Sequence, residues 1–262
     1  YLVYLGFDLN FEEDLKYVIQ QFKAEGITDL ILDLRFNNGG SVELARYLAA
    51  SIAGTSHRSD VFMRMQRNSG ADEYIRFGDG DDLNLKSVRI ICSEETASAS
   101  ELIISGLRGI DFPVKLFGSR TEGKNVGMEV QEYKYGNKYY EFAPITFRSF
   151  NAKDWGDYAD GIDPDVMLNN QNSSYEDDID NVFPYAFGDW DNFDFNYPLY
   201  WALCDVQGVD PTTGEPVKRS GRAGLTRSSK DEIIRVPSVP LKRPAGTFGS
   251  LIYNKPEVEN LY

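Results

Sequence analysis

A serine, a lysine and a glycine pair are the residues of this sequence whose types and placement suit acyl transfer. The serine, Ser98, lies in the segment 96–101, directly after the apolar run 88–92. A serine at the turn from a buried strand into a helix is presented at the carboxyl edge of the sheet, beside N–H groups that lack intrahelical acceptors and could stabilise an oxyanion. With Glu101 three positions later, the same serine also forms a capping box, which a helix can use for stability alone. On this motif by itself both interpretations stay open.

The lysine, Lys124, lies in a glycine-flanked loop, 118–125, that comes within one residue of a phosphate-binding P-loop. That motif requires Ser or Thr where Asn125 stands, and a helix where residues 126–130 favour an extended chain. We therefore do not expect nucleotide binding. Desolvation lowers the pKa of a lysine in an apolar pocket, and a neutral lysine can take a proton from a serine hydroxyl. The alternative for a lone lysine is an exposed surface side chain.

The glycine pair, Gly39 and Gly40, ends the run 33–40, which overlaps the apolar segment 30–34. Glycines after a strand let the backbone turn sharply and bring N–H groups close to a ligand. A plain turn explains the pair as well. Asp33 and Arg35 favour a structural ion pair that braces this loop rather than a catalytic role.

Alternating strands and helices must position these residues. Apolar residues at helical spacing predict helices, and short apolar runs predict strands that are covered on both faces. The predicted helices and strands before Gly118 are helix 11–25, strand 30–34, a helix from Val42, strand 88–92, helix 98–107 and strand 114–117. Gly136-Asn137 then suits the turn of a β-hairpin formed by residues 128–133 and 138–147. This order predicts an α/β fold with a largely parallel sheet and an added hairpin region.

Composition excludes several classes of function. The chain has 262 residues and a net charge of −14, which would repel the phosphates of nucleic acids and an anionic membrane surface. The only histidine, His57, lies in a polar segment, so a histidine-rich metal site is excluded and a solvated loop residue is expected. Cys92 and Cys204 lack metal-ligand spacing. No stretch approaches the roughly 18 apolar residues of a membrane-spanning helix.

Charge divides the C-terminal part of the chain. Residues 150–200 carry twelve acidic side chains against one basic one, whereas residues 211–245 carry eight basic side chains against three acidic ones. We expect the basic segment to be extended and to lie against the acidic one. No calcium-binding loop pattern occurs in the acidic segment, and no metal is expected there.

Taken together and in order, four motifs resemble those of the C-terminal processing, or tail-specific, serine proteases, which use a Ser-Lys dyad on a ClpP/crotonase-like α/β fold. The motifs are Asp33-Leu34-Arg35-x-Asn37-x-Gly39-Gly40, Ser98-Ala99-Ser100-Glu101, Thr121-x-Gly123-Lys124 and Asp160-Gly161-Ile162-x-Pro164-Asp165. The resemblance extends from about Tyr1 to Val166. It implies a catalytic domain over residues 1–168 and an irregular C-terminal extension, 169–262, packed on or near that domain. No PDZ-like substrate-binding domain precedes Tyr1 in this chain.

The resemblance also implies roles for individual residues. These are Ser98 as nucleophile, Lys124 as general base, Glu101 as the residue that helps to hold the lysine, and the amides of Gly39 or Gly40 and of Ala99 as the oxyanion hole. It implies no cofactor and no nucleotide, an unstructured polypeptide as substrate, and a cell-envelope location, exported and in some members lipid-anchored. The oligomeric state is left open. Two alternatives remain: a non-catalytic peptide-binding relative, and a crotonase-like acyl-thioester enzyme that would not need the Ser98–Lys124 pair.

Overall fold

A parallel sheet forms the centre of the computed structural model, which describes residues 1–168, 187–188 and 193–217. Its strands are β1 (Leu2–Val3), β2 (Leu30–Asp33), β5 (Val88–Cys92), β6 (Val114–Gly118) and β11 (Val166–Met167), in the order β1-β2-β5-β6-β11. All neighbours in this sheet pair in parallel. The carboxyl ends of β2, β5 and β6 therefore meet at one edge, where the three motifs with candidate chemistry follow.

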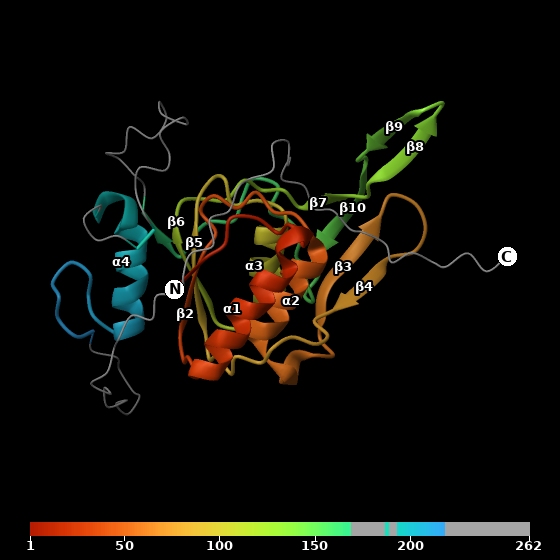
Figure 1. The fold of residues 1–262 in the computed structure, drawn as a ribbon. Helices are drawn as coiled ribbons and strands as arrows, with labels where there is room; N and C mark the ends of the chain where they lie inside the picture. Colours follow the sequence, from red (N-terminus) through yellow and green to blue (C-terminus); the bar gives the residue numbers. More distant parts are fainter. Residues whose placement is uncertain (169–186, 189–192, 218–262) are drawn as a thin grey trace.

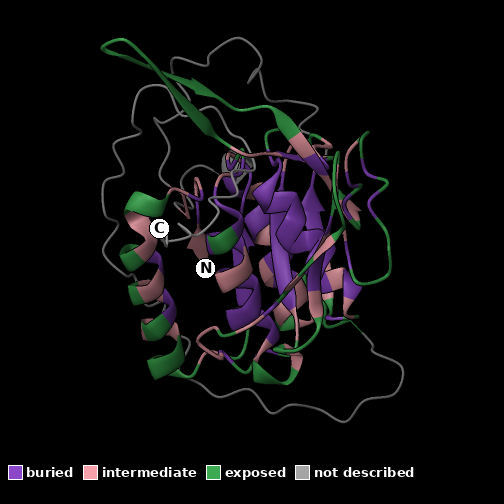
Figure 2. Ribbon diagram, turned by 90° about the vertical axis from the view of Figure 1, so that its right-hand side faces the viewer, coloured by how far each residue is buried: buried purple, intermediate pink, exposed green. Residues whose placement is uncertain are grey.

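Helices cover both faces of this sheet (Figure 1). The helices α1 (Glu12–Glu25), α2 (Val42–Ala53) and α3 (Ala99–Gly109) lie on one side, and α4 (Phe193–Gln207) lies on the other. Successive strand residues point to opposite faces. Accordingly, Ile90 and Leu116 belong to the core beneath α1–α3, whereas Ile91 and Phe117 pack with Leu199 of α4. This explains why the strands are continuously apolar, and Figure 2 shows them as the buried centre.

A second, antiparallel sheet lies beside the first. Its order is β4 (Glu73–Arg76), β3 (Val61–Arg67), β10 (Ile145–Phe150) and β7 (Val126–Met128). The separate hairpin β8 (Gln131–Tyr135) and β9 (Lys138–Phe142) turns at Gly136-Asn137, as predicted, but the predicted strand 138–147 is divided into β9 and β10. Sequence analysis does not predict β3 or β4. The α/β prediction with an added hairpin is confirmed.

Local signals set the helix ends. Gly26 ends α1 with a left-handed φ of 65°, which glycine adopts without the steric cost of a side chain, and Ser41 begins α2 by accepting a hydrogen bond from the Leu44 amide. Two short 3₁₀ helices, η1 (Leu9–Phe11) and η2 (Thr55–His57), lie in the connections. The side chain of His57, the only histidine, pairs with Asp60 in an exposed loop, as expected for a solvated residue.

Helix α4 is a correction to the expected irregular extension. Its buried residues Leu199 and Ala202 face the sheet, and Asp205 binds Arg89 of β5 at 2.9 Å and Lys115 of β6 at 2.5 Å. Apolar contact and these ion pairs thus join α4 to the central strands. The expected contact between the acidic and basic segments falls largely on residues outside the described ranges. Among the described residues, no helix combines the length and apolar character needed to cross a bilayer.

Candidate active site

Ser98 lies in a sharp turn between the carboxyl end of β5 and the first turn of α3. The turn is held by Thr96, whose Oγ1 accepts from the Ser93 amide and donates to the Leu34 carbonyl, and by the Ala97 amide, which donates to the Asn37 carbonyl. Ser98 has φ 61° and ψ −114°, a conformation that favours glycine and costs other residues about 1–3 kcal/mol. Such strain concentrates at functional sites, including the strand-to-helix turns that expose a nucleophilic serine.

The capping-box interpretation explains only part of this serine. Its N–H donates to Glu101 Oε2 at 2.9 Å, which is one arm of the box. Although residues 98 and 101 have the arrangement of a capping box, Ser98 Oγ makes no cap hydrogen bond. The hydroxyl is fully buried and has no hydrogen-bond partner in the described part of the chain. A buried polar atom without a partner is rare and costly, so this hydroxyl points to a role other than capping.

Glu101 joins the serine turn to the lysine loop. Its Oε2 accepts from the amides of Ser98 and Lys124, at 2.9 and 2.8 Å, and its Oε1 accepts from the Gly123 amide and from Thr121 Oγ1, at 2.7 and 2.5 Å. The side chain is fully buried. Burial raises the pKa of this carboxyl group, whereas the four donated hydrogen bonds favour its ionised form. Because two amides share one oxygen, the main chains of Ser98 and Lys124 lie together.

Lys124 is half-buried in the loop between β6 and β7. Desolvation lowers the pKa of its ammonium group, and the charges of Glu122 and Glu101 oppose that shift. No hydrogen bond joins Lys124 Nζ to Ser98 Oγ, since that oxygen has no partner among the described residues. The structure thus brings the two residues together through Glu101 and leaves the side-chain contact of the dyad unmade.

The loop that resembles a P-loop differs from one in two ways. The segment after Lys124 forms β7, as the sequence predicts, where a P-loop would begin a helix. The amides of Gly123 and Lys124 donate to the Glu101 carboxylate, so the groups that would hold a phosphate already hold a protein anion.

The glycine turn lies directly against the serine. A Cβ added to Gly39 would lie 2.7 Å from Ser98 Cβ and 2.9 Å from the Ala99 nitrogen, and one added to Gly40 would lie 2.3 Å from the Phe7 carbonyl oxygen. Both glycines have a positive φ, 103° and 134°. Only glycine fits either position without displacement of the main chain.

The three expected oxyanion donors are not equivalent. The Gly39 amide donates to Asn37 Oδ1 at 2.9 Å. The amides of Gly40 and Ala99 donate to no other group within the described ranges. Gly40 and Ala99 therefore fit the expected role better, while Gly39 shapes the turn.

Asn37 and Thr121 organise the site, and sequence reasoning assigned neither a role. Asn37 is fully buried, its Nδ2 donates to the Tyr4 carbonyl, and its own carbonyl accepts from the Ala97 amide and from Ser100 Oγ. Thr121 Oγ1 accepts from the Ile162 amide as it donates to the carboxylate. Both residues lie inside the recognised motifs, and that position is the sequence signal that could have indicated their role.

The Asp33–Arg35 prediction is confirmed as a structural ion pair. Arg35 Nη2 lies 2.7 Å from Asp33 Oδ2, and the Tyr1 hydroxyl donates to the same carboxylate at 2.6 Å. Within the described ranges, the structure groups no three residues of the types that bind metals.

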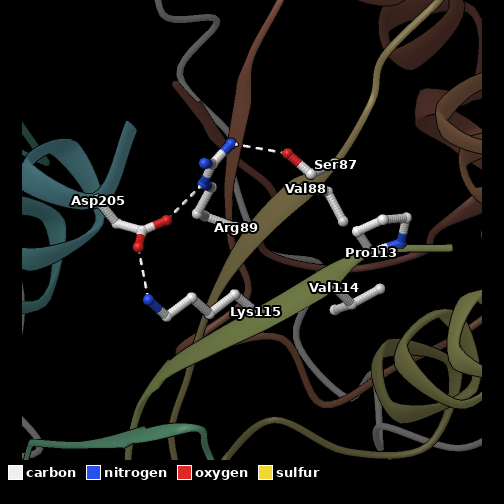
Figure 3. A pocket seen from close by; sticks show the side chains of 7 residues that line it. All are labelled: Ser87, Val88, Arg89, Pro113, Val114, Lys115 and Asp205. Atoms are coloured by element: carbon white, nitrogen blue, oxygen red, sulfur yellow. Dashed lines mark hydrogen bonds and ion pairs between the residues drawn. The ribbon is translucent and has the colours of Figure 1, made fainter. Parts of the chain in front are cut away.

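A shallow pocket of about 210 Å³ lies elsewhere (Figure 3). It lies at the amino ends of β5 and β6, between Ser87 and Pro113, with Asp205 of α4 beside Arg89 and Lys115. Ser98 follows the carboxyl end of β5, so the pocket is at the opposite edge of the sheet. We do not assign it to the candidate active site.

Comparison with known proteins finds a family that matches the part of the chain containing the site. The model of "Peptidase family S41" matches residues 1–168, which contain every element of the site. The chain belongs to peptidase family S41. The "Probable CtpA-like serine protease" of Staphylococcus haemolyticus (strain JCSC1435) is 26% identical over 165 residues, 62% of this chain and 32% of that one. Its counterpart in Staphylococcus aureus (strain COL) is 26% identical over 181 residues, 68% and 35% of the two chains. The chain thus spans about a third of the length of these curated relatives.

Solved S41 structures share the fold. The "Putative S41 protease from Bacteroides fragilis NCTC 9343" superposes with a TM-score of 0.62 at 22% identity, over 79% of this chain and 53% of that one. The "Photosystem II D1 C-terminal processing protease" has a TM-score of 0.52 at 21% identity, over 64% and 41%. These similarities show that the α/β core and its antiparallel sheet have the S41 arrangement.

Proposed function

We propose that this chain is the catalytic part of a serine endopeptidase that cleaves polypeptides through an acyl-enzyme on Ser98. The observation that carries the proposal is the Ser98 hydroxyl, which is buried in a strained turn, has no hydrogen-bond partner among the described residues, and lies near a lysine whose pKa is lowered. Membership of a peptidase family supports a peptide bond as the target.

In the proposed first step, neutral Lys124 Nζ takes the proton from Ser98 Oγ as that oxygen attacks the peptide carbonyl carbon. The negative charge that develops on the carbonyl oxygen is stabilised by the amides of Gly40 and Ala99, which have no competing acceptor among the described residues. The Lys124 ammonium then gives its proton to the leaving amine. In the second step water, activated by the same lysine, releases the acyl group and restores the serine.

Glu101 acts as a positioning residue in this mechanism. It accepts from the main-chain amides of Ser98 and Lys124, on both sides of the dyad, and its charge favours the protonated form of the Lys124 side chain. To form the Ser98–Lys124 hydrogen bond, only the two side chains then have to move, because Glu101 already holds their main chains in place. Catalytic hydrogen bonds are often long in the absence of substrate.

The second candidate function is a non-catalytic peptide-binding relative. The missing Ser98–Lys124 hydrogen bond favours it, because a permanently open dyad has no activated nucleophile. A crotonase-like acyl-thioester enzyme has less support, since the strained Ser98 would then serve no purpose.

An extended polypeptide is the proposed substrate, and a cell-envelope location follows from the family resemblance. Cell fractionation with an antibody to the chain tests the location, and a signal confined to the cytoplasm would contradict it.

Cleavage of an unfolded polypeptide tests the activity. Wild type should cleave it and react with a fluorophosphonate probe at Ser98, whereas Ser98→Ala and Lys124→Ala should lose both properties. Lys138→Ala, which removes an exposed lysine from β9, is the matched control and should behave as wild type. If wild type neither cleaves nor reacts, the peptide-binding alternative holds; if both active-site variants cleave like wild type, the dyad is wrong.

A further inference from the structure

The hairpin β8–β9 extends away from the body of the molecule in both views (Figures 1 and 2). Every residue of its two strands is exposed. An isolated two-stranded hairpin is at best marginally stable in water, and exposed edge strands invite pairing with another chain. A hairpin of this kind becomes stable when more strands join it.

The hairpin has two chemically different faces. In its register Tyr133 lies opposite Tyr140, so these two side chains share one face. That face is mainly aromatic, and its members are Tyr133, Tyr135, Tyr140 and Phe142, together with Gln131 and Lys138. Alternation places Glu132, Lys134, Tyr139 and Glu141 on the other face. All four aromatic residues of the first face are more than 40% exposed.

The outer edge of β8 is open. In the described part of the chain, β8 pairs only with β9. Tyr135 and Lys138 flank the two-residue turn and so form a hydrogen-bonded pair of the ladder. Hydrogen-bonded pairs alternate along an antiparallel ladder, so the backbone groups of Glu132 and Lys134 point to the open edge.

The charges on this edge are not compensated within the hairpin. Glu132 lies directly opposite Glu141, and like charges in that position destabilise a sheet. Among the described residues neither Glu132 nor Lys134 forms an ion pair; the Lys134 ammonium lies 5.0 Å from the centre of the Tyr139 ring. One edge thus presents an unpaired negative charge and an unpaired positive charge, two residues apart.

We propose that β8 pairs antiparallel with β8 of a second copy of this chain, around a two-fold axis at Tyr133. This register places Glu132 of each copy opposite Lys134 of the other, on the same face and with backbone groups directed at each other. The neighbouring registers that keep the backbone groups matched place Lys134 against Lys134, or Glu132 against Glu132. Charge therefore selects one register and one occupant, because the edge is complementary to itself.

The aromatic face supports the same register. The two hairpins become one four-stranded sheet in the order β9-β8-β8-β9. In it Tyr140 and Tyr133 of one copy continue into Tyr133 and Tyr140 of the other as a row of four rings. Cross-strand aromatic neighbours of this kind stabilise antiparallel sheets.

A charge-exchange experiment on the full chain tests the dimer by sedimentation velocity. The sedimenting wild-type species should have twice the mass of the monomer. Glu132→Lys alone and Lys134→Glu alone should each raise the dissociation constant at least about tenfold, because two attractive pairs become repulsive in each homodimer. An equimolar mixture of the two variants should form a heterodimer, since all cross-strand pairs are then opposite in charge. The double variant Glu132→Lys/Lys134→Glu should recover the homodimer.

Lys138→Glu is the matched control, because it changes the net charge as Lys134→Glu does but lies on β9, away from the two-fold edge. It should leave the dimer intact. Exposed positions keep the fold, which circular dichroism of each variant verifies. A wild type that is monomeric at its highest soluble concentration, or a mixture that associates no better than its components, would overturn the proposal. If the hairpin instead binds substrate, wild type would be monomeric and the single variants would have an altered KM.

Discussion

Replacement of Glu101 by glutamine tests whether one buried carboxylate holds the active site together. The change keeps the size of the side chain and converts one oxygen, an acceptor, into an NH₂ group, a donor. Every hydrogen bond to Glu101 is donated by its partner: by the amides of Ser98, Gly123 and Lys124 and by the hydroxyl of Thr121. If the NH₂ group replaces Oε2, the amides of Ser98 and Lys124 both face a donor; if it replaces Oε1, the Gly123 amide faces a donor while the Thr121 hydroxyl can turn to accept.

The magnitude follows from burial. A buried donor left without an acceptor costs about 1–3 kcal/mol, so the loss of at least one acceptor should lower the free energy of unfolding by at least about 1–3 kcal/mol. At 2–4 °C per kcal/mol for a chain near this size, the melting temperature should fall by at least about 2 °C. Catalytic turnover should fall as well, because the amides next to Ser98 and Lys124 lose their common anchor.

Urea denaturation and thermal melting of Glu101→Gln measure the first effect, and cleavage of an unfolded polypeptide below the melting transition measures the second. Glu122→Gln is the matched control for stability, since it is the same substitution at an exposed residue next to Gly123. A variant that melts within 1 °C of wild type and keeps its turnover would refute the reasoning that Glu101 anchors both halves of the site.

Three further predictions concern other features. Ser98→Gly should raise the free energy of unfolding by about 1 kcal/mol, since glycine relieves the strain of φ 61°, and should abolish cleavage because the nucleophile is lost. Urea denaturation measures the gain in stability, and an unchanged midpoint would contradict it. The rate of cleavage should increase as pH rises through the pKa of Lys124, which lies below the ordinary lysine value, because only neutral Lys124 accepts the serine proton. A pH–rate profile without this rising limb would exclude Lys124 as the base. Burial alone would raise the pKa of Asp205, but its hydrogen bonds with Lys115 and Arg89 lower it below the unfolded value. Its stabilising effect is therefore present above the unfolded pKa and is lost as pH falls through the folded one. Asp205→Asn should reduce stability at neutral pH and weaken its acid dependence, measured by thermal melts across pH; equal loss at every pH would contradict this account.

Local patterns were enough to predict the parts of the fold that local physics controls. Continuous apolar runs predicted β2, β5 and β6, because these strands are covered on both faces. The hairpin turn at Gly136-Asn137 and the end of α1 at Gly26 were predicted for the same kind of reason, since each depends on the conformational freedom of one or two residues.

Elements that depend on distant partners were not predicted. Strands β3 and β4 acquire their role only through pairing with each other and with β10, far along the chain. Helix α4 contains Pro198 and has a weak apolar pattern, and it is stabilised by Ile31, Ile91 and Phe117 of the sheet. Nothing in the residues near Leu199 indicates that such a surface exists.

The sequence by itself determined which residues are candidates for chemistry, because residue type and motif order carry that information: a serine at a strand-to-helix turn, a lysine in a glycine loop, and a glycine pair. Only the tertiary structure decided how they act on one another. It showed that, among the described residues, the Ser98 hydroxyl is buried without a partner and the amides of Gly40 and Ala99 have no acceptor, whereas Gly39 donates to Asn37. It also showed that Glu101 accepts from the main-chain amides of Ser98 and Lys124. The glycine turn, the serine turn and the lysine loop come from segments up to about sixty residues apart, as in the Ser100–Asn37 hydrogen bond. How such segments meet depends on how the strands pair, which no local pattern encodes.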